Sequence, residues 1–369
     1  MIYRDYGKTG KKVSLLGFGG MRFKNVDDHD ECVRLMVAAA EGGINYFDTA
    51  PGYFESRSET VYGKGFAEFR KRGLPYYCAT KTFATTESDI RKEIDAQLKR
   101  LDIPSIDFYH IWNITTLDDW EKRKKDGILQ SFKKLKDEGL IKHICISSHL
   151  IKDEINQLLM EGVFEGVLFG YSAYNFRTRE AAFNAIKENK LGSVVMNPLG
   201  GGVIPDHPDL FTFLRREGAV DRQTEDTAAM ALRFLWDHPD ISVTLVGFDT
   251  IEHLKNALRA MEDYTPRTAA ELEEVKSKAS ASFEGICTGC AYCVAKGVNC
   301  PVDIPIPQYM DTYNQKLLNK NSKDPIGDRL KWHWSLDRAG AGKCIECGQC
   351  EAACTQHINI IERLKEIAG

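Results

Sequence analysis

Hydrophobic and polar positions between residue 13 and about residue 263 alternate between two kinds of segment. Short runs rich in β-branched and aromatic residues are typical of buried strands, and longer stretches between them repeat their apolar residues at helical spacing. The strand candidates are residues 13–19, 44–50, 76–82, 106–113, 141–148, 166–175, 193–200 and 242–248. Helix candidates include 29–43, which ends at a glycine, and 87–101, which begins acidic and ends basic, as the helix dipole favours.

Eight strand–helix units in about 250 residues predict an α/β fold, a (β/α)₈ TIM barrel. A doubly wound sheet competes with it, but the first turn, GFGGMRFKN, lacks a full dinucleotide fingerprint and does not open directly into a helix. The segment before the first strand predicts a small hairpin that would cap the closed end of the barrel. Two long loops, 114–126 and 201–226, are expected over the open end, where substrates and cofactors are usually covered.

The composition of the chain changes after Tyr264. A charged helix at 269–280 follows, and two cysteine motifs then bracket a connecting helix near 307–319. A length of 369 residues also favours two domains. We therefore predict a barrel domain at 1–268 and a mainly helical second domain at 269–369.

The charge balance excludes some classes of partner. The chain has 49 basic and 53 acidic residues, well mixed, for a formal net charge of −4. No basic stripe for nucleic acid and no polybasic membrane patch is present. No apolar run approaches the ~18 residues of a membrane span, and the polar N-terminus lacks a signal-peptide core. We expect a cytoplasmic protein that binds neither nucleic acid nor membranes.

Cysteine usage is concentrated near the C-terminus. Of 11 cysteines, three (Cys32, Cys78 and Cys145) are scattered and read as small core residues. The other eight form two motifs, Cys287-x2-Cys290-x2-Cys293-x6-Cys300 and Cys344-x2-Cys347-x2-Cys350-x3-Cys354. In a reducing compartment such clustering indicates metal ligation rather than disulfides.

Triple cysteines at three-residue steps are typical of 4Fe–4S clusters, and the fourth cysteine of each motif typically serves the other cluster. We therefore predict one cluster on Cys287, Cys290, Cys293 and Cys354, and a second on Cys300, Cys344, Cys347 and Cys350. Two Cys₄ zinc sites are the alternative, although zinc sites usually pair two CxxC units. The six residues before Cys300 and the threonine at position 355 depart from the ferredoxin pattern. The wide spacing of the motifs resembles ferredoxin-like dicluster modules.

The run GGINYFDTAPGYFESRSETVYGKGF resembles the signature of the aldo/keto reductase family. The resemblance implies a catalytic group of Asp48, Tyr53 and Lys81 at the barrel mouth. A tyrosine titrates near ~10, so it needs a neighbouring ammonium, itself paired to a carboxylate, to donate a proton near neutrality.

The fourth catalytic residue of that family is a histidine, and Trp112 stands in its place. Either His110, two residues earlier, takes over the role, or the site works without it. Altered residues at this place can accompany reduction of a conjugated C=C bond instead of a carbonyl.

The resemblance also implies a nicotinamide cofactor across the barrel mouth. Its binding residues would be Ser147, Ser148, Asn175, Asn197, Leu199, Gly200, Gly247 and Asn256. NADP is usual in the family, but no basic residue follows Gly247, so NADP and NAD both stay open.

The barrel signature and the cysteine motifs together resemble the iron–sulfur-containing branch of the family. They imply an NAD(P)-dependent oxidoreductase that reduces a small-molecule substrate and passes electrons through two 4Fe–4S clusters, with a redox protein as a further partner. A flavin would bridge hydride and one-electron chemistry, although no flavin motif is evident. Two alternatives stay open: clusters that are structural or oxygen-sensing, and an electron-transfer module with a vestigial barrel site.

Overall fold

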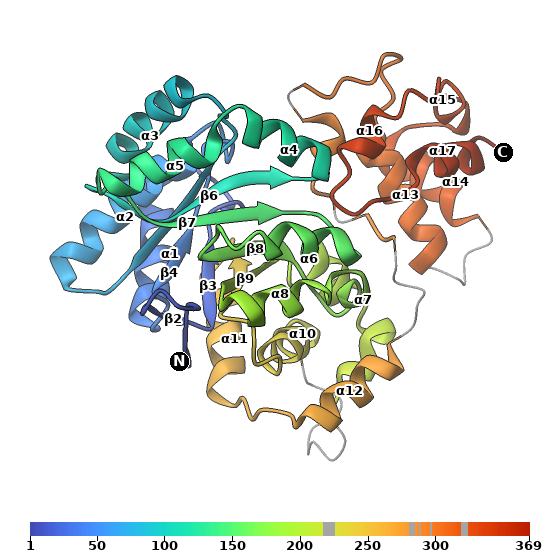
Figure 1. Cartoon of the computed structure of the whole chain (residues 1–369). Coiled ribbons are helices and arrows are strands. Elements are labelled where there is room, and N and C mark those ends of the chain that lie inside the picture. The colour runs from blue at the N-terminus through green and yellow to red at the C-terminus, as the bar shows by residue number, and fades with distance from the viewer. Residues whose placement is uncertain (217–225, 280–284, 288, 296, 319–323) are drawn as a thin grey trace. The chain divides into compact units, whose positions relative to one another are not determined.

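The computed structural model describes residues 1–216, 226–279, 285–287, 289–295, 297–318 and 324–369. They form two compact units, which Figure 1 colours by position along the chain. The first unit comprises Met1–Pro198 and Gln223–Glu273, and the second comprises Leu199–Arg222 and Glu274–Gly369. The eight-strand pattern and the cysteine motifs therefore belong to different units.

The first unit contains a closed barrel of parallel strands (Figure 1). Its strands are β3 (Leu16–Gly19), β4 (Tyr46–Asp48), β5 (Tyr77–Thr82), β6 (Ile106–Ile114), β7 (Ile141–Ser148), β8 (Gly166–Gly170), β9 (Gly192–Met196) and β10 (Val243–Gly247). Neighbours in sequence pair in order, and β10 closes the ring by pairing with both β9 and β3. The predicted (β/α)₈ barrel is confirmed.

Helices follow the strands around the outside of the barrel. They are α1 (His29–Glu41), α2 (Arg57–Arg72), α3 (Glu87–Leu101), α4 (Leu117–Lys125), α5 (Ile128–Asp137), α6 (Lys152–Met160), α7 (Phe176–Arg179), α8 (Ala182–Asn189), α10 (Thr227–Trp236) and α11 (Ile251–Glu262). The division between the two units falls within α12 (Ala269–Lys278). Helix α3 has the predicted bounds because Thr86 caps it by accepting from the Asp89 N–H, and Ile90 and Ile94 are buried one turn apart.

The N-terminal hairpin joins β1 (Tyr3–Asp5) to β2 (Lys12–Ser14) in antiparallel register. Tyr6 leaves it to fill the barrel interior, where its ring lies 4.1 Å from that of Phe108. A Cβ on Gly192 would lie 2.1 Å from the Tyr6 ring, so only glycine fits there. The single strand predicted at 13–19 is wrong, because Ser14 pairs within the hairpin whereas Leu16 begins the parallel pairing of the barrel.

The long loop predicted at 114–126 is also wrong, because most of it is helix α4. Thr116 caps this helix by accepting from the Asp119 N–H, and basic residues fill its last turn. In the other predicted loop, the described residues form η1 (Gly200–Gly202), α9 (Val203–Asp206) and η2 (Pro208–Leu214), and residues 217–225 lie outside the described part.

The second unit is mainly helical. Besides η1, α9 and η2 it contains η4 (Tyr292–Val294), α13 (Ile306–Leu318), α14 (Pro325–Arg329), η5 (Leu330–Trp334), α15 (Arg338–Ala341), α16 (Gln349–Ala352) and α17 (Ile360–Ala368). Its apolar core joins Tyr309 and Met310 of α13 to Leu364 and Ile367 of α17, with several cysteines packed at its border.

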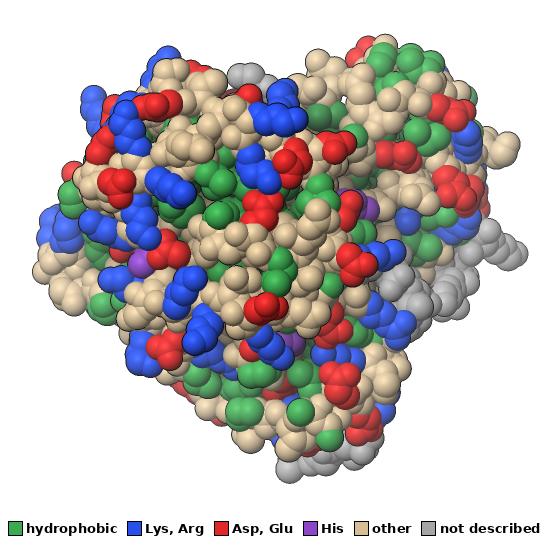
Figure 2. Space-filling view, viewed as in Figure 1, with side chains coloured by type: hydrophobic (Ala, Val, Ile, Leu, Met, Phe, Trp, Pro, Cys, Tyr) green, Lys and Arg blue, Asp and Glu red, His purple; other side chains and the backbone are tan. Residues whose placement is uncertain are grey.

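Charged side chains of both signs are interspersed over the face that Figure 2 shows, with no broad patch of a single sign. Within the ranges that the structure describes, no helix has the length and apolar character that crossing a membrane would require.

Candidate functional site

The ends of β4 and β5 hold a buried ion pair. The Lys81 ammonium donates to Asp48 Oδ1 at 2.5 Å and to the Thr49 carbonyl at 2.9 Å, and both charged side chains are 1% exposed. Burial raises the pKa of Asp48 and lowers the pKa of Lys81, and in each case the charge of the partner opposes the shift. The Asp48 carboxylate therefore stabilises the charged Lys81 ammonium at a buried position, where an unpaired ammonium would be strongly disfavoured.

Tyr53 follows β4 and is half-buried beside this pair. The Lys81 ammonium lies 5.4 Å from the centre of the Tyr53 ring. The structure thus brings together Asp48, Lys81 and Tyr53, the three residues that the sequence placed at the barrel mouth. An ammonium beside a phenol stabilises the phenolate, which is what a tyrosine acid needs to release its proton.

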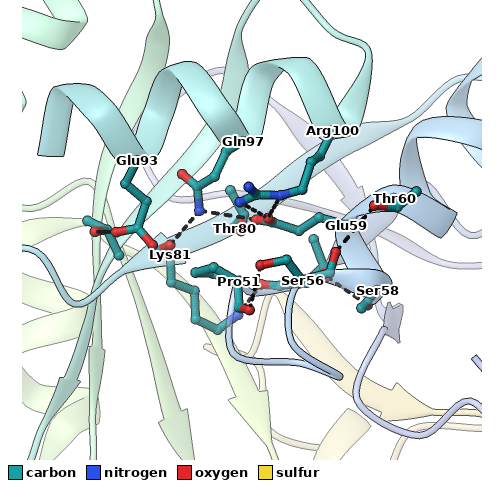
Figure 3. Close-up of polar contacts among 12 residues, drawn as sticks. Pro51, Ser56, Ser58, Glu59, Thr60, Thr80, Lys81, Glu93, Gln97 and Arg100 are labelled. Carbon is teal, nitrogen blue, oxygen red and sulfur yellow. Dashed lines mark hydrogen bonds and ion pairs between the residues drawn. The ribbon is translucent and has the colours of Figure 1, made fainter. Parts of the chain in front are cut away.

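A buried carboxylate behind β5 holds the strand that carries Lys81 (Figure 3). Glu59 of α2 is fully buried and accepts from Thr80 Oγ1 at 2.8 Å and from Arg100 Nη2 at 2.6 Å. The Gln97 side-chain amide donates both to Glu59 Oε1 at 3.1 Å and to the Lys81 carbonyl at 2.8 Å. The network ties α2 and α3 to the backbone of Lys81 and so fixes the origin of its side chain.

His110 lies beside Lys81 in the register of β5 and β6 and is fully buried. Burial and the neighbouring Lys81 ammonium lower the pKa of His110 to about 3. Neither ring nitrogen makes a hydrogen bond of ordinary geometry to any part of the chain that the structure describes. His110 is therefore a neutral imidazole one layer below the mouth.

Trp112, two residues further along β6, is the aromatic residue at the rim. Its ring meets that of Tyr53 edge to face at 5.9 Å and stacks on the ring of Phe83 at 4.0 Å. Trp112 is 4% exposed whereas Phe83 is 46% exposed. The rim beside Tyr53 is thus a flat aromatic wall, where the family pattern would place an imidazole.

The residues predicted to bind the nicotinamide ring lie at or just beyond the ends of β7, β8 and β9. The Ser147 hydroxyl is buried without a hydrogen-bond partner among the described residues. Ser148 Oγ accepts from the Leu150 N–H at 3.2 Å, and Asn175 Oδ1 accepts from the Ser172 N–H at 2.8 Å. Asn197 follows β9 in a left-handed conformation, with φ of 59°.

Gly247 ends β10, and Thr250 caps α11 by accepting from the His253 N–H. A Cβ on Gly247 would lie 2.5 Å from Cγ of Arg22, so the arginine stem packs against this glycine. The exposed Arg22 guanidinium has no ion-pair or hydrogen-bond partner in the described ranges. Sequence reasoning missed Arg22, because it searched for a basic residue after Gly247 rather than across the barrel.

Three predicted cofactor residues remain. Asn256 is half-buried on α11 and accepts from Arg259 of the same helix. Leu199 and Gly200 belong to the second unit, where Gly200 begins η1.

Within the second unit, cysteines of both predicted sets lie near one another. In the first set the thiols interact electrostatically: burial and then the neighbouring thiolates Cys290 and Cys354 raise the pKa of Cys287 to about 12. The pKa of Cys293 also rises to about 12, from burial and then from the charges of Cys287, Cys290, Cys354 and Cys350, the last of which belongs to the second set.

The second set, Cys300, Cys344, Cys347 and Cys350, lines one cavity together with apolar side chains such as Val302 and Ile304. Cys293 of the first set also reaches this cavity, so the two sets are neighbours. Sulfur donors with an apolar surround suit an iron–sulfur cluster, and the raised thiol pKa values mean that assembly must release protons. The ligand role of each cysteine stays a prediction.

Comparison with known proteins identifies both units. The aldo/keto reductase family model matches residues 15–279, and a 4Fe–4S dicluster domain model matches residues 286–359. The chain belongs to the aldo/keto reductase family, is an oxidoreductase, and carries a C-terminal 4Fe–4S dicluster domain.

Two curated relatives illustrate the similarity of the barrel. The uncharacterized oxidoreductase YrpG of Bacillus subtilis is 25% identical over 305 residues, which cover 71% of this chain and 91% of the relative. L-galactose dehydrogenase of Arabidopsis thaliana is 27% identical over 286 residues, covering 70% and 88%.

Solved structures agree on the fold. The holo form of the aldo-keto reductase AKR11C1 from Bacillus halodurans superimposes with a TM-score of 0.65 at 26% identity, covering 76% of this chain and 97% of that structure. An aldo-keto reductase from Klebsiella pneumoniae in complex with NADPH gives a TM-score of 0.61 at 17% identity, over 76% and 96% of the chains.

Proposed function

We propose that this chain reduces a carbonyl or a conjugated C=C bond of a small molecule with a nicotinamide cofactor, and that its two 4Fe–4S clusters take part in the electron transfer. The observation that carries the proposal is the buried Asp48–Lys81 pair with Tyr53 beside it. A bound nicotinamide would supply the hydride. Tyr53 would donate the proton from its phenolic oxygen, and Lys81 would stabilise the phenolate that remains.

Asp48 would act through Lys81. Its carboxylate keeps the ammonium charged in a site where burial lowers the pKa of Lys81. Trp112 excludes water from one side of Tyr53 and offers a flat apolar surface to the substrate. A substrate with a planar conjugated group would stack on this surface more readily than a flexible polar one.

The residues at the strand ends fit a nicotinamide cofactor. The buried, unpartnered hydroxyl of Ser147 would hydrogen-bond the carboxamide, because a buried donor without a partner is costly. The guanidinium of Arg22 would bind a phosphate of the cofactor at the Gly247 end. We propose NADP, whose additional phosphate gives this cation a ligand that NAD lacks.

The electrons of a hydride move as a pair, whereas each cluster takes one. Coupling the barrel to the clusters would therefore need a flavin as co-reactant. In a separate turnover the flavin would accept the hydride in place of the substrate and pass its two electrons on singly, one to each cluster. Reduced clusters would pass electrons to a redox protein partner. The exposure of Cys347 and of Ile345, which is 59% exposed, supports a route to such a partner through the second cysteine set.

The test is an anaerobic preparation with measured iron content and visible spectrum, to which NADPH or NADH is added with and without flavin. Bleaching of the cluster absorption supports coupled electron transfer, and binding without bleaching in either condition contradicts it. Tyr53→Phe should lower turnover about a hundredfold or more while cofactor binding persists. Tyr3→Phe is the matched control, because its hydroxyl only donates to the Gly43 carbonyl at the surface.

A further inference from the structure

Arg363 of α17 is a cation inside the dicluster unit. Its guanidinium lies 4.6 Å from the centre of the Tyr313 ring of α13, an arrangement typical of a cation–π contact. A Cβ on Gly285 would lie 2.6 Å from Nη2 of Arg363. The guanidinium therefore packs against the backbone of Gly285, two residues before Cys287. Any larger residue in place of Gly285 would occupy the space that the guanidinium fills.

The same turn of α13 holds the Cys287 backbone. The Cys287 N–H donates to Asn314 Oδ1 at 2.9 Å, and Asn314 Nδ2 donates back to the Cys287 carbonyl at 2.7 Å. Asn314 follows Tyr313 in the sequence, so one helix turn positions both the arginine and the first cysteine of the motif. The guanidinium and Cys287 are thus held in a fixed relation.

The Nη1 nitrogen of Arg363 is buried and makes no hydrogen bond to the residues that the structure describes. The charge of Arg363 interacts with Cys287 and Cys354, two members of the first set. Glu366, a carboxylate whose charge also acts on Arg363, is already paired with Lys316 at 2.6 Å. A buried N–H without an acceptor is destabilising, which points to an acceptor that belongs to the cluster.

We propose that Arg363 donates Nη1–H to a sulfur of the first cluster, or of its cysteine ligands, and thereby raises the reduction potential of that cluster. Reduction adds one electron and one negative charge to the cluster, with no bond made or broken in the protein. A nearby cation stabilises the reduced state more than the oxidised state, and hydrogen bonds to the sulfurs act in the same direction. Arg363 would thus make the first cluster easier to reduce than it would be without this cation.

This inference rests on the clusters of the proposed function, but not on nicotinamide turnover. The test is a redox titration of the anaerobic holoprotein with a chemical reductant, followed by electron paramagnetic resonance. The variants are Arg363→Met, which keeps an apolar stem of similar length, and Arg363→Lys, which keeps the charge without the planar fork. Lys316→Met is the matched control, because Lys316 contacts the same Tyr313 ring from an exposed position.

In Arg363→Met we expect one of the two midpoint potentials to become more negative, by about a tenfold change in the reduction equilibrium or ~59 mV for one electron. Arg363→Lys should shift the same midpoint by less, and Lys316→Met should leave both in place. Full iron content in each variant would show that the unit still folds. Equal shifts of both midpoints, or no shift, would overturn the proposal, as would a preparation that holds zinc instead of iron. Clusters that titrate normally but ignore NADPH would count against the proposed function alone.

Discussion

Removing Lys81 should destabilise the barrel far more than removing both members of its ion pair. In Lys81→Met the Asp48 carboxylate stays 1% exposed and loses the ammonium 2.5 Å away. Breaking a buried pair in this way costs about 3–5 kcal/mol, whereas replacing both charges by neutral groups is often close to neutral. A typical domain is stable by only about 5–15 kcal/mol, so the single variant should lose a large part of its stability.

The double variant Asp48→Asn/Lys81→Met completes a thermodynamic cycle. We expect it to lie within about 1 kcal/mol of the wild type, so that the two single changes are strongly non-additive. Urea unfolding followed by tryptophan fluorescence measures the free energy, since Trp120 and Trp236 are fully buried in the barrel unit.

The pH dependence of Lys81→Met gives a second check. Burial raises the pKa of Asp48, so the folded variant binds a proton more readily than the unfolded chain. Its deficit in stability should therefore shrink as the pH falls from neutrality toward the ordinary range of a carboxyl. Strictly additive single changes, or a deficit that grows on acidification, would refute the account of a buried, mutually dependent pair.

Three further predictions test other parts of the first unit. Arg22→Ala should weaken NADPH binding about tenfold or more in a calorimetric titration; Arg34→Ala, a change on the exposed side of α1, should not, and equal effects would refute a phosphate contact. Glu165→Gln should cost roughly 1–2 kcal/mol of folding stability at pH 7 and little near pH 2. Burial opposes ionisation of Glu165, but hydrogen bonds from His143 and other donors lower the pKa of Glu165 to about 2. The stability that the carboxylate contributes is therefore lost as the pH falls from 4.5. His110 should show no imidazole titration by NMR between pH 5 and 9, because its pKa is about 3, and stability that depends on it should fall as pH drops below 6.5; a midpoint near 6.5 would contradict its burial.

Local pattern predicted the elements and several of their bounds. Residues 87–101 carry a cap, an apolar stripe and the charge polarity of a helix within one short window, and the structure places α3 there. The cysteine spacing likewise confines three thiols to one turn of backbone, whatever the rest of the chain does. The same local signals were present at 117–125, where the Thr116 cap and the basic last turn mark α4, and the loop prediction overlooked them.

Burial and long-range contact could not be predicted from such windows. Glu59 and Arg100 each look like charges on a solvated helix face, and only the packing of α2 and α3 against β5 buries the carboxylate between them. Arg22 and Gly247 are separated by most of the barrel sequence, and they meet in space because β10 closes the barrel by pairing with β3.

The sequence by itself therefore determined the eight-unit barrel and the two cysteine motifs, because these depend on periodicity and spacing along the chain, whereas the residues at the barrel mouth were implied by a family resemblance. The tertiary structure decided which charges are buried, which imidazole is neutral and which cations face the sites. Those properties depend on solvent exclusion by segments distant in sequence, since the free energy of a charge is set by what surrounds it in space.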